Sequence, residues 1–171
     1  MKNILFMLTL LVTNVMSCQI SSNIISETNF YNIKINNIPL HDIVTTNGDR
    51  QQLRDLIPAF IIESNIDPDG EFSYYSYDGF KIGFSRNLGT IDNPILGGFE
   101  ITKNNWNLTI QGTTITIGDD ISALGNVVFN TMRSGDKSII YQYCHGCNNF
   151  IYVYFDQNTN LITEIGFIEQ T

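Results

Sequence analysis

Cys144 and Cys147 are the residues whose type and spacing most clearly suggest chemistry. A C-x-x-C pair can exchange disulfides, attach haem, bind a metal ion or close a structural disulfide. Thiol exchange favours a first cysteine at a helix N-terminus, whereas Cys144 follows an apolar, strand-like segment. Haem attachment needs a histidine after the second cysteine, where Asn148 stands, and zinc needs two further ligands, which His41 alone cannot supply. A structural disulfide is therefore favoured, with redox and metal sites as the alternatives.

The turn between the two cysteines supports the disulfide. In the first half of the chain, Tyr77-Asp78-Gly79-Phe80 carries a strong two-residue hairpin signal, and His145-Gly146 occupies the corresponding place in the second half. Residues that flank such a turn have Cα atoms within disulfide range, and an exported protein meets an oxidising compartment. We therefore predict a bond between Cys144 and Cys147.

Other motifs that could carry catalysis or metal binding are incomplete. Asn65 to Phe72 has the pattern of the first half of a calcium loop, but position 12 of that loop is Ser76, where a bidentate glutamate is required. An acidic turn that leads into a strand explains the segment better. The sequence contains no G-x-S-x-G, no H-E-x-x-H and no phosphate-binding glycine loop. We expect a protein that is not an enzyme and has no catalytic residue, metal or cofactor.

Residues 1–18 have the parts of an export signal. Lys2 supplies a positive charge, and Ile4 to Val12 form an apolar stretch that is too short to span a bilayer. Val15-Met16-Ser17-Cys18 resembles the lipobox of bacterial lipoproteins, in which the chain is cleaved before the cysteine and the cysteine is lipidated. The resemblance implies lipidation of Cys18 and, because no acidic residue follows it, an outer-membrane anchor that leaves the domain periplasmic or surface-facing. Ordinary secretion with an incidental cysteine is the alternative.

The remaining composition describes an acidic folded domain on a tether. Removal of the signal takes away Lys2 and leaves eight basic against seventeen acidic side chains, a net charge of −9. Such a surface repels nucleic acid and anionic headgroups, so we expect no nucleic-acid partner and membrane contact only through the lipid. The polar residues 19–29 are predicted to be a linker.

The folded part contains two series of similar segments, which predicts two tandem repeats, residues 30–104 and 105–171. Tyr75 to Tyr77 matches Tyr141 to Tyr143, and Leu96 to Ile101 matches Ile162 to Phe167 at the same offset. Chance similarity rarely gives a shared offset.

Each repeat opens with a predicted β-hairpin, because two alternating segments carry a central turn dipeptide, Asn36-Asn37 in the first and Gln111-Gly112 in the second. A helix is predicted next in each repeat, over Asp49 to Ile57 and Asp119 to Phe129, with the aspartate as N-cap. Three strands follow. The expected fold is α+β, with a short helix packed on an antiparallel sheet in each of two repeats.

The alternation along the strands predicts which side chains share a face. In the first repeat, Tyr75 and Tyr77 face the core, while Tyr74, Lys81 and Gly83 face the other way. In the second repeat, a two-residue turn at His145-Gly146 places four apolar side chains on the face opposite to Tyr141 and Tyr143. They are Ile140, Ile151, Val153 and Phe155.

An apolar outer face must be covered by the protein itself or by a partner. We predict that these four side chains bind a partner protein, provided that they are not already buried within the monomer. Internal packing is the alternative.

The order of elements, with Ile117-Gly118-Asp119-Asp120-Ile121-Ser122-Ala123-Leu124 leading into the second helix, resembles two related groups. One comprises the tandem-repeat β-lactamase inhibitor proteins, and the other comprises outer-membrane assembly lipoproteins of the SmpA/OmlA type. The chain is also similar to small lipoproteins of Bacteroidetes-type bacteria. These resemblances imply a lipid-anchored, non-catalytic protein-binding module of inhibitor or immunity type. The alternatives are a scaffold subunit of an envelope assembly machine and an envelope enzyme that uses the thiol of Cys144 or Cys147.

Overall fold

The computed structural model describes residues 22–59, 61–66, 72–90, 93–144 and 147–169, and its fold is α+β with more strand than helix. The predicted export signal and Cys18 lie outside these residues. No helix in the described ranges is long and apolar enough to cross a membrane. The elements in chain order are β1 (Asn23–Ile24), α2 (Glu27–Tyr31), β2 (Lys34–Ile35), β3 (Ile38–Pro39), α3 (Leu40–Thr45), α4 (Arg50–Leu56), β4 (Glu63–Ile66), β5 (Phe72–Tyr77), β6 (Phe80–Thr90), β7 (Asn93–Ile101), β8 (Asn107–Ile110), β9 (Thr113–Thr116), the 3₁₀ turn η1 (Ile121–Leu124), β10 (Phe129–Thr131), β11 (Lys137–Gln142), β12 (Asn149–Phe155) and β13 (Ile162–Glu169).

Both predicted hairpins are confirmed, and they join into one small sheet. The turn residues Asn36 and Asn37 have φ values of 48° and 67°, and Gln111 and Gly112 have values of 51° and 83°. Two consecutive left-handed residues are typical of the tight hairpin turn that matches the twist of its strands. The hairpins then pair with each other through β2 and β8, which gives the strand order β3-β2-β8-β9.

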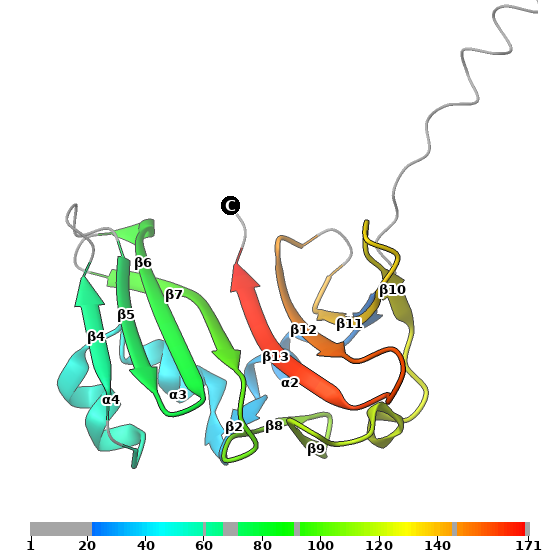
Figure 1. Ribbon diagram of the computed structural model, residues 1–171. Helices are drawn as coiled ribbons and strands as arrows, with labels where there is room; N and C mark the ends of the chain where they lie inside the picture. The colour runs from blue at the N-terminus through cyan, green and yellow to red at the C-terminus, as the bar shows by residue number, and fades with distance from the viewer. Residues whose placement is uncertain (1–21, 60, 67–71, 91–92, 145–146, 170–171) are drawn as a thin grey trace, which may run out of the picture.

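The remaining strands form one large sheet in the order β1-β11-β12-β13-β7-β6-β5-β4, with β10 also paired to β11. Within it, β7 pairs antiparallel with β13, while β6 and β5 continue on one side and β12 and β11 on the other (Figure 1). Residues 30–104 and 105–171 therefore contribute strands to both sheets, and the two parts share one hydrogen-bonded framework.

One of the two predicted helices is confirmed. The carboxylate of Asp49 accepts a hydrogen bond from the backbone N–H of Gln52 and caps α4, which ends before Pro58. The prediction of a helix over Asp119 to Phe129 is wrong, since only η1 forms there. Gly125 has a φ of 69°, a left-handed conformation that ends the helix after a single turn.

The described part of the predicted linker, residues 22–29, belongs to the fold instead. β1 lies parallel to β11, and the Asn23 side-chain amide donates to the carbonyl oxygens of Val128 and Ile140 at 3.1 and 3.0 Å. Phe30 of α2 is buried in the core. The exposed backbone edge of β11 supplies hydrogen-bond partners that are invisible in a polar, aperiodic sequence.

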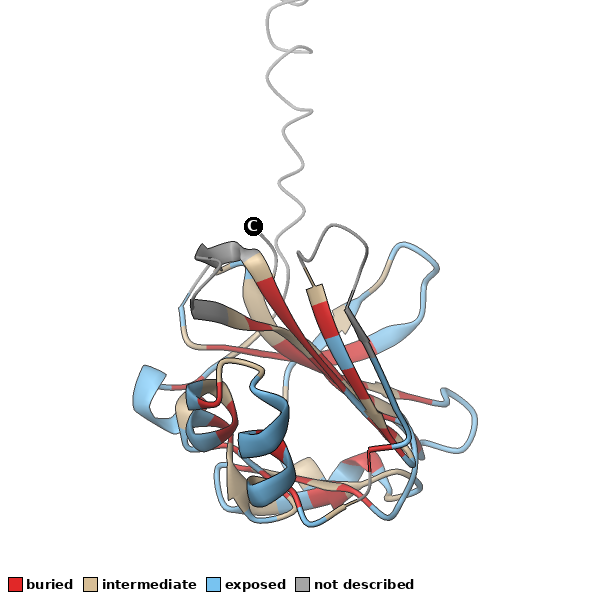
Figure 2. Cartoon of the chain, turned by 90° about the vertical axis from the view of Figure 1, so that its left-hand side faces the viewer, coloured by how far each residue is buried: buried red, intermediate tan, exposed pale blue. Residues whose placement is uncertain are grey.

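The hydrophobic core lies between the large sheet and a second layer made of the helices and the small sheet (Figure 2). Trp106, between β7 and β8, connects the layers: its ring centroid lies 4.5 Å from that of Phe80, and its indole N–H donates to the Asp78 carbonyl oxygen at 2.7 Å. Among the described residues, the helices and the small sheet cover only one face of the large sheet, so its other face, called the outer face below, is the place to look for a site.

Candidate binding site

The four side chains predicted to bind a partner are already buried in the monomer. Ile151 and Val153 have no exposed surface, and Ile140 and Phe155 are 7% and 8% exposed. Ile151, Val153 and Phe155 belong to the core between the layers. The condition set for that prediction therefore fails, and the four side chains form no partner surface.

A one-residue difference in register explains the error. A two-residue turn at 145–146 would place Ile140 opposite Ile151, whereas the structure pairs Ile140 with Tyr152 and Tyr141 with Ile151. Because side chains alternate along a strand, a slip of one residue moves all of β12 to the other face. Ile151 and Val153 thus turn into the core, and Tyr152 turns outward with Ile140.

The outer face of the large sheet carries a shallow groove of about 320 Å³. It crosses β5, β6, β7 and β13, and Tyr152 of β12 closes one end. Its lining comprises Phe72, Tyr74, Lys81, Ile82, Gly83, Gly97, Gly98, Phe99, Glu100, Tyr152, Phe167, Ile168 and Glu169. We call this feature the sheet groove.

Glycines make the floor of the sheet groove, and aromatic rings stand beside them. Gly83 of β6 pairs with Gly98 of β7, so the middle of the outer face has no side chains. A Cβ atom built on Gly83 would lie 3.0 Å from the Tyr74 ring, and one on Gly98 would lie 2.8 Å from the Phe167 carbonyl oxygen. The hollow therefore depends on residues without a side chain at both positions.

The walls of the sheet groove combine aromatic and charged groups. Tyr74 is 48% exposed and stacks on Phe72, with ring centroids 6.1 Å apart. Lys81 lies opposite Glu100 in the β6–β7 register. This combination suits the binding of apolar and charged groups of a ligand, because aromatic rings offer contact area and the charges give orientation.

At the far end of the sheet groove, the Tyr152 hydroxyl donates a hydrogen bond of 2.7 Å to the Glu164 carboxylate. Burial is the main reason that the pKa of Tyr152 is raised, and the Glu164 hydrogen bond and the nearby carboxylate charges add to it. Tyr152 therefore stays a neutral donor, and its ring is fixed as a wall.

Substituting Gly166 with alanine is expected to destabilise the protein by about 1–3 kcal/mol. The Tyr152 ring lies directly over Gly166, and a Cβ atom there would overlap it. Urea denaturation of Gly166→Ala, Tyr152→Ala and the double variant measures this contact. The double variant should cost less than the sum of the single variants, because removal of the ring removes the overlap; strict additivity would contradict the prediction.

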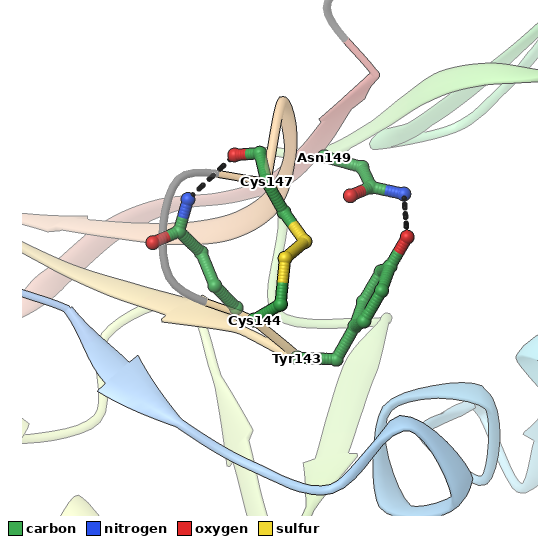
Figure 3. The surroundings of a disulfide bond; sticks show 5 residues. Tyr143, Cys144, Cys147 and Asn149 are labelled. Carbon is green, nitrogen blue, oxygen red and sulfur yellow. Dashed lines mark hydrogen bonds between the residues drawn. A yellow bond between two sulfur atoms is a disulfide. The ribbon is translucent and has the colours of Figure 1, made fainter.

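The predicted disulfide is present, with the Cα atoms of Cys144 and Cys147 5.5 Å apart. Figure 3 shows that two side-chain hydrogen bonds accompany it: the Gln142 amide donates to the Cys147 carbonyl oxygen at 2.8 Å, and the Asn149 amide donates to the Tyr143 hydroxyl at 3.0 Å. His145 and Gly146 lie outside the described residues. Because the two cysteines are bonded to each other, neither offers a free thiol for catalysis.

Replacing both cysteines with serine is expected to lower the free energy of unfolding by about 2 kcal/mol, the chain-entropy value for so short a loop. Chemical denaturation of Cys144→Ser/Cys147→Ser measures the loss. Wild-type protein under reducing conditions should show the same midpoint as the variant. Equal stability of the variant and the oxidised wild type would show that the bond adds nothing.

Of the calcium-like segment, Phe72 lines the sheet groove, and residues 67–71 lie outside the described residues. No group of three His, Cys, Asp or Glu side chains in the described ranges could hold a metal ion. The residues that build the sheet groove were not predicted as a site. A signal for them existed, because the alternation of β5 and β6 already directs Tyr74, Lys81 and Gly83 away from the core.

Comparisons of this chain with protein-family models, with curated proteins and with solved structures found no match.

Proposed function

We propose that this protein is a lipid-anchored, non-catalytic protein-binding module of the bacterial cell envelope, and that the sheet groove is its recognition surface. The observation that carries the proposal is the aromatic-walled groove of about 320 Å³ that the described residues form over a glycine floor on the outer face of the large sheet. Binding sites are concave and mostly apolar, with a few polar groups that give orientation. The proposed mechanism is occlusion of a partner's surface, without bond chemistry.

The order of elements supports the further proposal that the chain consists of two related repeats. Each half supplies one hairpin to the small sheet and four consecutive strands to the large sheet, β4 to β7 and β10 to β13. The halves meet through antiparallel partners in both sheets, β2 with β8 and β7 with β13. Such pairing of equivalent strands is what two copies related by a twofold rotation would give.

The charge favours a cationic partner segment. The whole chain has a net charge of −8, and the outer face carries Glu100 and Glu164 beside the single lysine of the groove lining, Lys81. Complementary charge speeds association and excludes acidic competitors. The proposed partner is a protein with a basic, partly apolar surface segment, as an inhibitor or immunity protein would meet on its target enzyme.

Site-specific photo-crosslinking tests the surface directly. A crosslinking amino acid at Tyr74 should capture a single partner in intact cells, whereas the same group at Thr114, which is exposed on the small sheet, should not. A soluble enzyme as partner would indicate an inhibitor, and an integral barrel would favour the scaffold function. Equal capture at both positions would contradict the assignment of the sheet groove.

Affinity for the purified partner gives the second measurement. Tyr74→Ala should weaken binding by about 2 kcal/mol, or roughly thirtyfold, because exposed aromatic rings at the centre of an interface often dominate its energy. Phe129→Ala is the matched control: Phe129 is 41% exposed, close to the 48% of Tyr74, but it lies on β10 at the edge of the sheet. A loss of the same size in both variants would refute the proposed surface.

A further inference from the structure

A second, smaller pocket lies on the helix side of the large sheet, and it shares Phe167 and Glu169 with the lining of the sheet groove. Its volume is about 160 Å³, the scale of one amino-acid side chain. Residues of α2, α3, β7, β12 and β13 line it: Phe30, Tyr31, Leu40, Val44, Ile95, Leu96, Asn149, Phe167 and Glu169. We call it the helix-side pocket. It is apolar except for the Tyr31 hydroxyl, the Asn149 amide and one carboxylate.

That carboxylate belongs to Glu169, at the end of β13. Glu169 lies two residues after the core residue Phe167, and the alternation of a strand therefore directs it to the same face. Burial is the main cause that raises the pKa of Tyr31, and the nearby Glu169 charge contributes to it. Among the described residues, no hydrogen-bond donor or cation pairs with the Glu169 carboxylate, and the one ion pair found there joins Lys103 to Asp78.

Burial raises the pKa of Glu169 above its ordinary value. A partly desolvated carboxylate without a partner is unfavourable for the protein alone. A cation brought into the same pocket would restore the lost interaction, and in a dry site this attraction is stronger than in water.

Aromatic rings form one wall beside the carboxylate. The Phe30 ring lies 6.0 Å from Phe167 and 5.2 Å from Tyr143, and Tyr143 lies 6.2 Å from Tyr31. The Asn149 amide holds the Tyr143 hydroxyl. Carboxylate and aromatic rings around a narrow apolar space are the groups that recognise an ammonium ion on an aliphatic stem.

We propose that the helix-side pocket binds a primary alkylammonium group, with the Glu169 carboxylate pairing the ammonium and the rings of Phe30 and Tyr31 contacting the alkyl stem. A lysine side chain and a free aliphatic amine share this chemistry. The proposal does not rest on the function proposed for the sheet groove: Glu169 lines both features, but Phe30 and Tyr31 line the helix-side pocket alone, and Tyr74 lines the sheet groove alone.

The test uses two probes of equal chain length, pentylammonium chloride and 1-pentanol, titrated at neutral pH into isotope-labelled mature protein and followed by NMR. Pentylammonium should shift the signals of Tyr31, Val44 and the Glu169 carboxyl carbon and bind at least fivefold more tightly than pentanol. A lysine blocked at its α-amino and carboxyl groups should bind equally well if the natural source is a side chain, and more weakly if it is a free amine.

Two variants complete the test. Glu169→Gln should abolish the preference for pentylammonium over pentanol, and Glu164→Gln, a matched change on the outer face of the same strand, should preserve it. Equal affinity for the two probes, an unchanged preference in Glu169→Gln, shifts confined to Tyr74 and Lys81, or no saturable shift would each overturn the proposal.

Discussion

Raising the pH from 10 to 12 is expected to unfold the protein cooperatively. Burial raises the pKa of Tyr77 and of Tyr141 from 10.0 to about 12, and the two side chains are only 4% and 2% exposed. The folded state thus binds the hydroxyl protons of these two tyrosines more tightly than the unfolded chain does. The resulting stability is complete below pH 10 and is lost as the pH rises through about 12.

The expected loss is large. A shift of about two pKa units corresponds to roughly 2–3 kcal/mol for each tyrosine, and so to about 5 kcal/mol for both. Small domains are stable by only about 5–15 kcal/mol, so this loss alone approaches the lower limit. Circular dichroism and tyrosinate absorbance, recorded together as the pH is raised, should change in one transition.

Variants identify the responsible groups. Tyr77→Phe should raise the pH of the transition at little cost at neutral pH, since the Tyr77 hydroxyl is buried without a hydrogen-bond partner. Tyr141→Phe should also raise it. Tyr74→Phe, with its ring 48% exposed, should leave it unchanged. Gradual ionisation of all tyrosines without unfolding would contradict the expectation.

Phe80→Ala is expected to reduce the free energy of unfolding by about 3–5 kcal/mol, the range for truncating a buried phenylalanine. Phe80 is 1% exposed and packs against Trp106, Tyr77 and Phe99, with centroid distances of 4.5, 5.6 and 6.2 Å. Its ring packs on Trp106, the side chain that connects the two layers. A cavity there removes contacts between the two layers of the fold.

Urea denaturation followed by circular dichroism measures this loss, with the fluorescence of Trp106 as a second probe. Phe129→Ala is the control for the same chemical change at a site that is 41% exposed, where the cost should be about 1 kcal/mol or less. A loss in Phe80→Ala no larger than in Phe129→Ala would show that this contact does not hold the layers together.

Local features were predicted well from the sequence. The hairpin turns at Asn36-Asn37 and Gln111-Gly112, the Asp49 cap and the Cys144–Cys147 bond each depend on a few adjacent residues. Turn dipeptides, capping side chains and cysteine spacing act through local geometry, so neighbouring residues are enough to specify them.

Features that depend on distant segments were missed. The segment 22–29 had no periodic pattern, yet the edge of β11 accepts it. The helix expected over Asp119 to Phe129 shortened to one turn, because Gly125 adopts a left-handed conformation. The predicted register between β11 and β12 was wrong by one residue, which placed the side chains of β12 on the wrong face of the sheet. The predicted partner-binding side chains were wrong for this reason.

The sequence by itself determined an acidic α+β domain, its hairpins and its disulfide, because composition and short-range geometry specify these features. Only the tertiary structure decided that the two hairpins share one sheet, that the strands of both halves form one continuous large sheet, and which face of that sheet stays open. These outcomes depend on strand pairings between residues far apart in the chain, such as Ile35 with Leu108 and Ile165 with Ile101. The backbone of a strand can form hydrogen bonds with many other strands. The native pairing is the one that best buries the apolar side chains of both layers together.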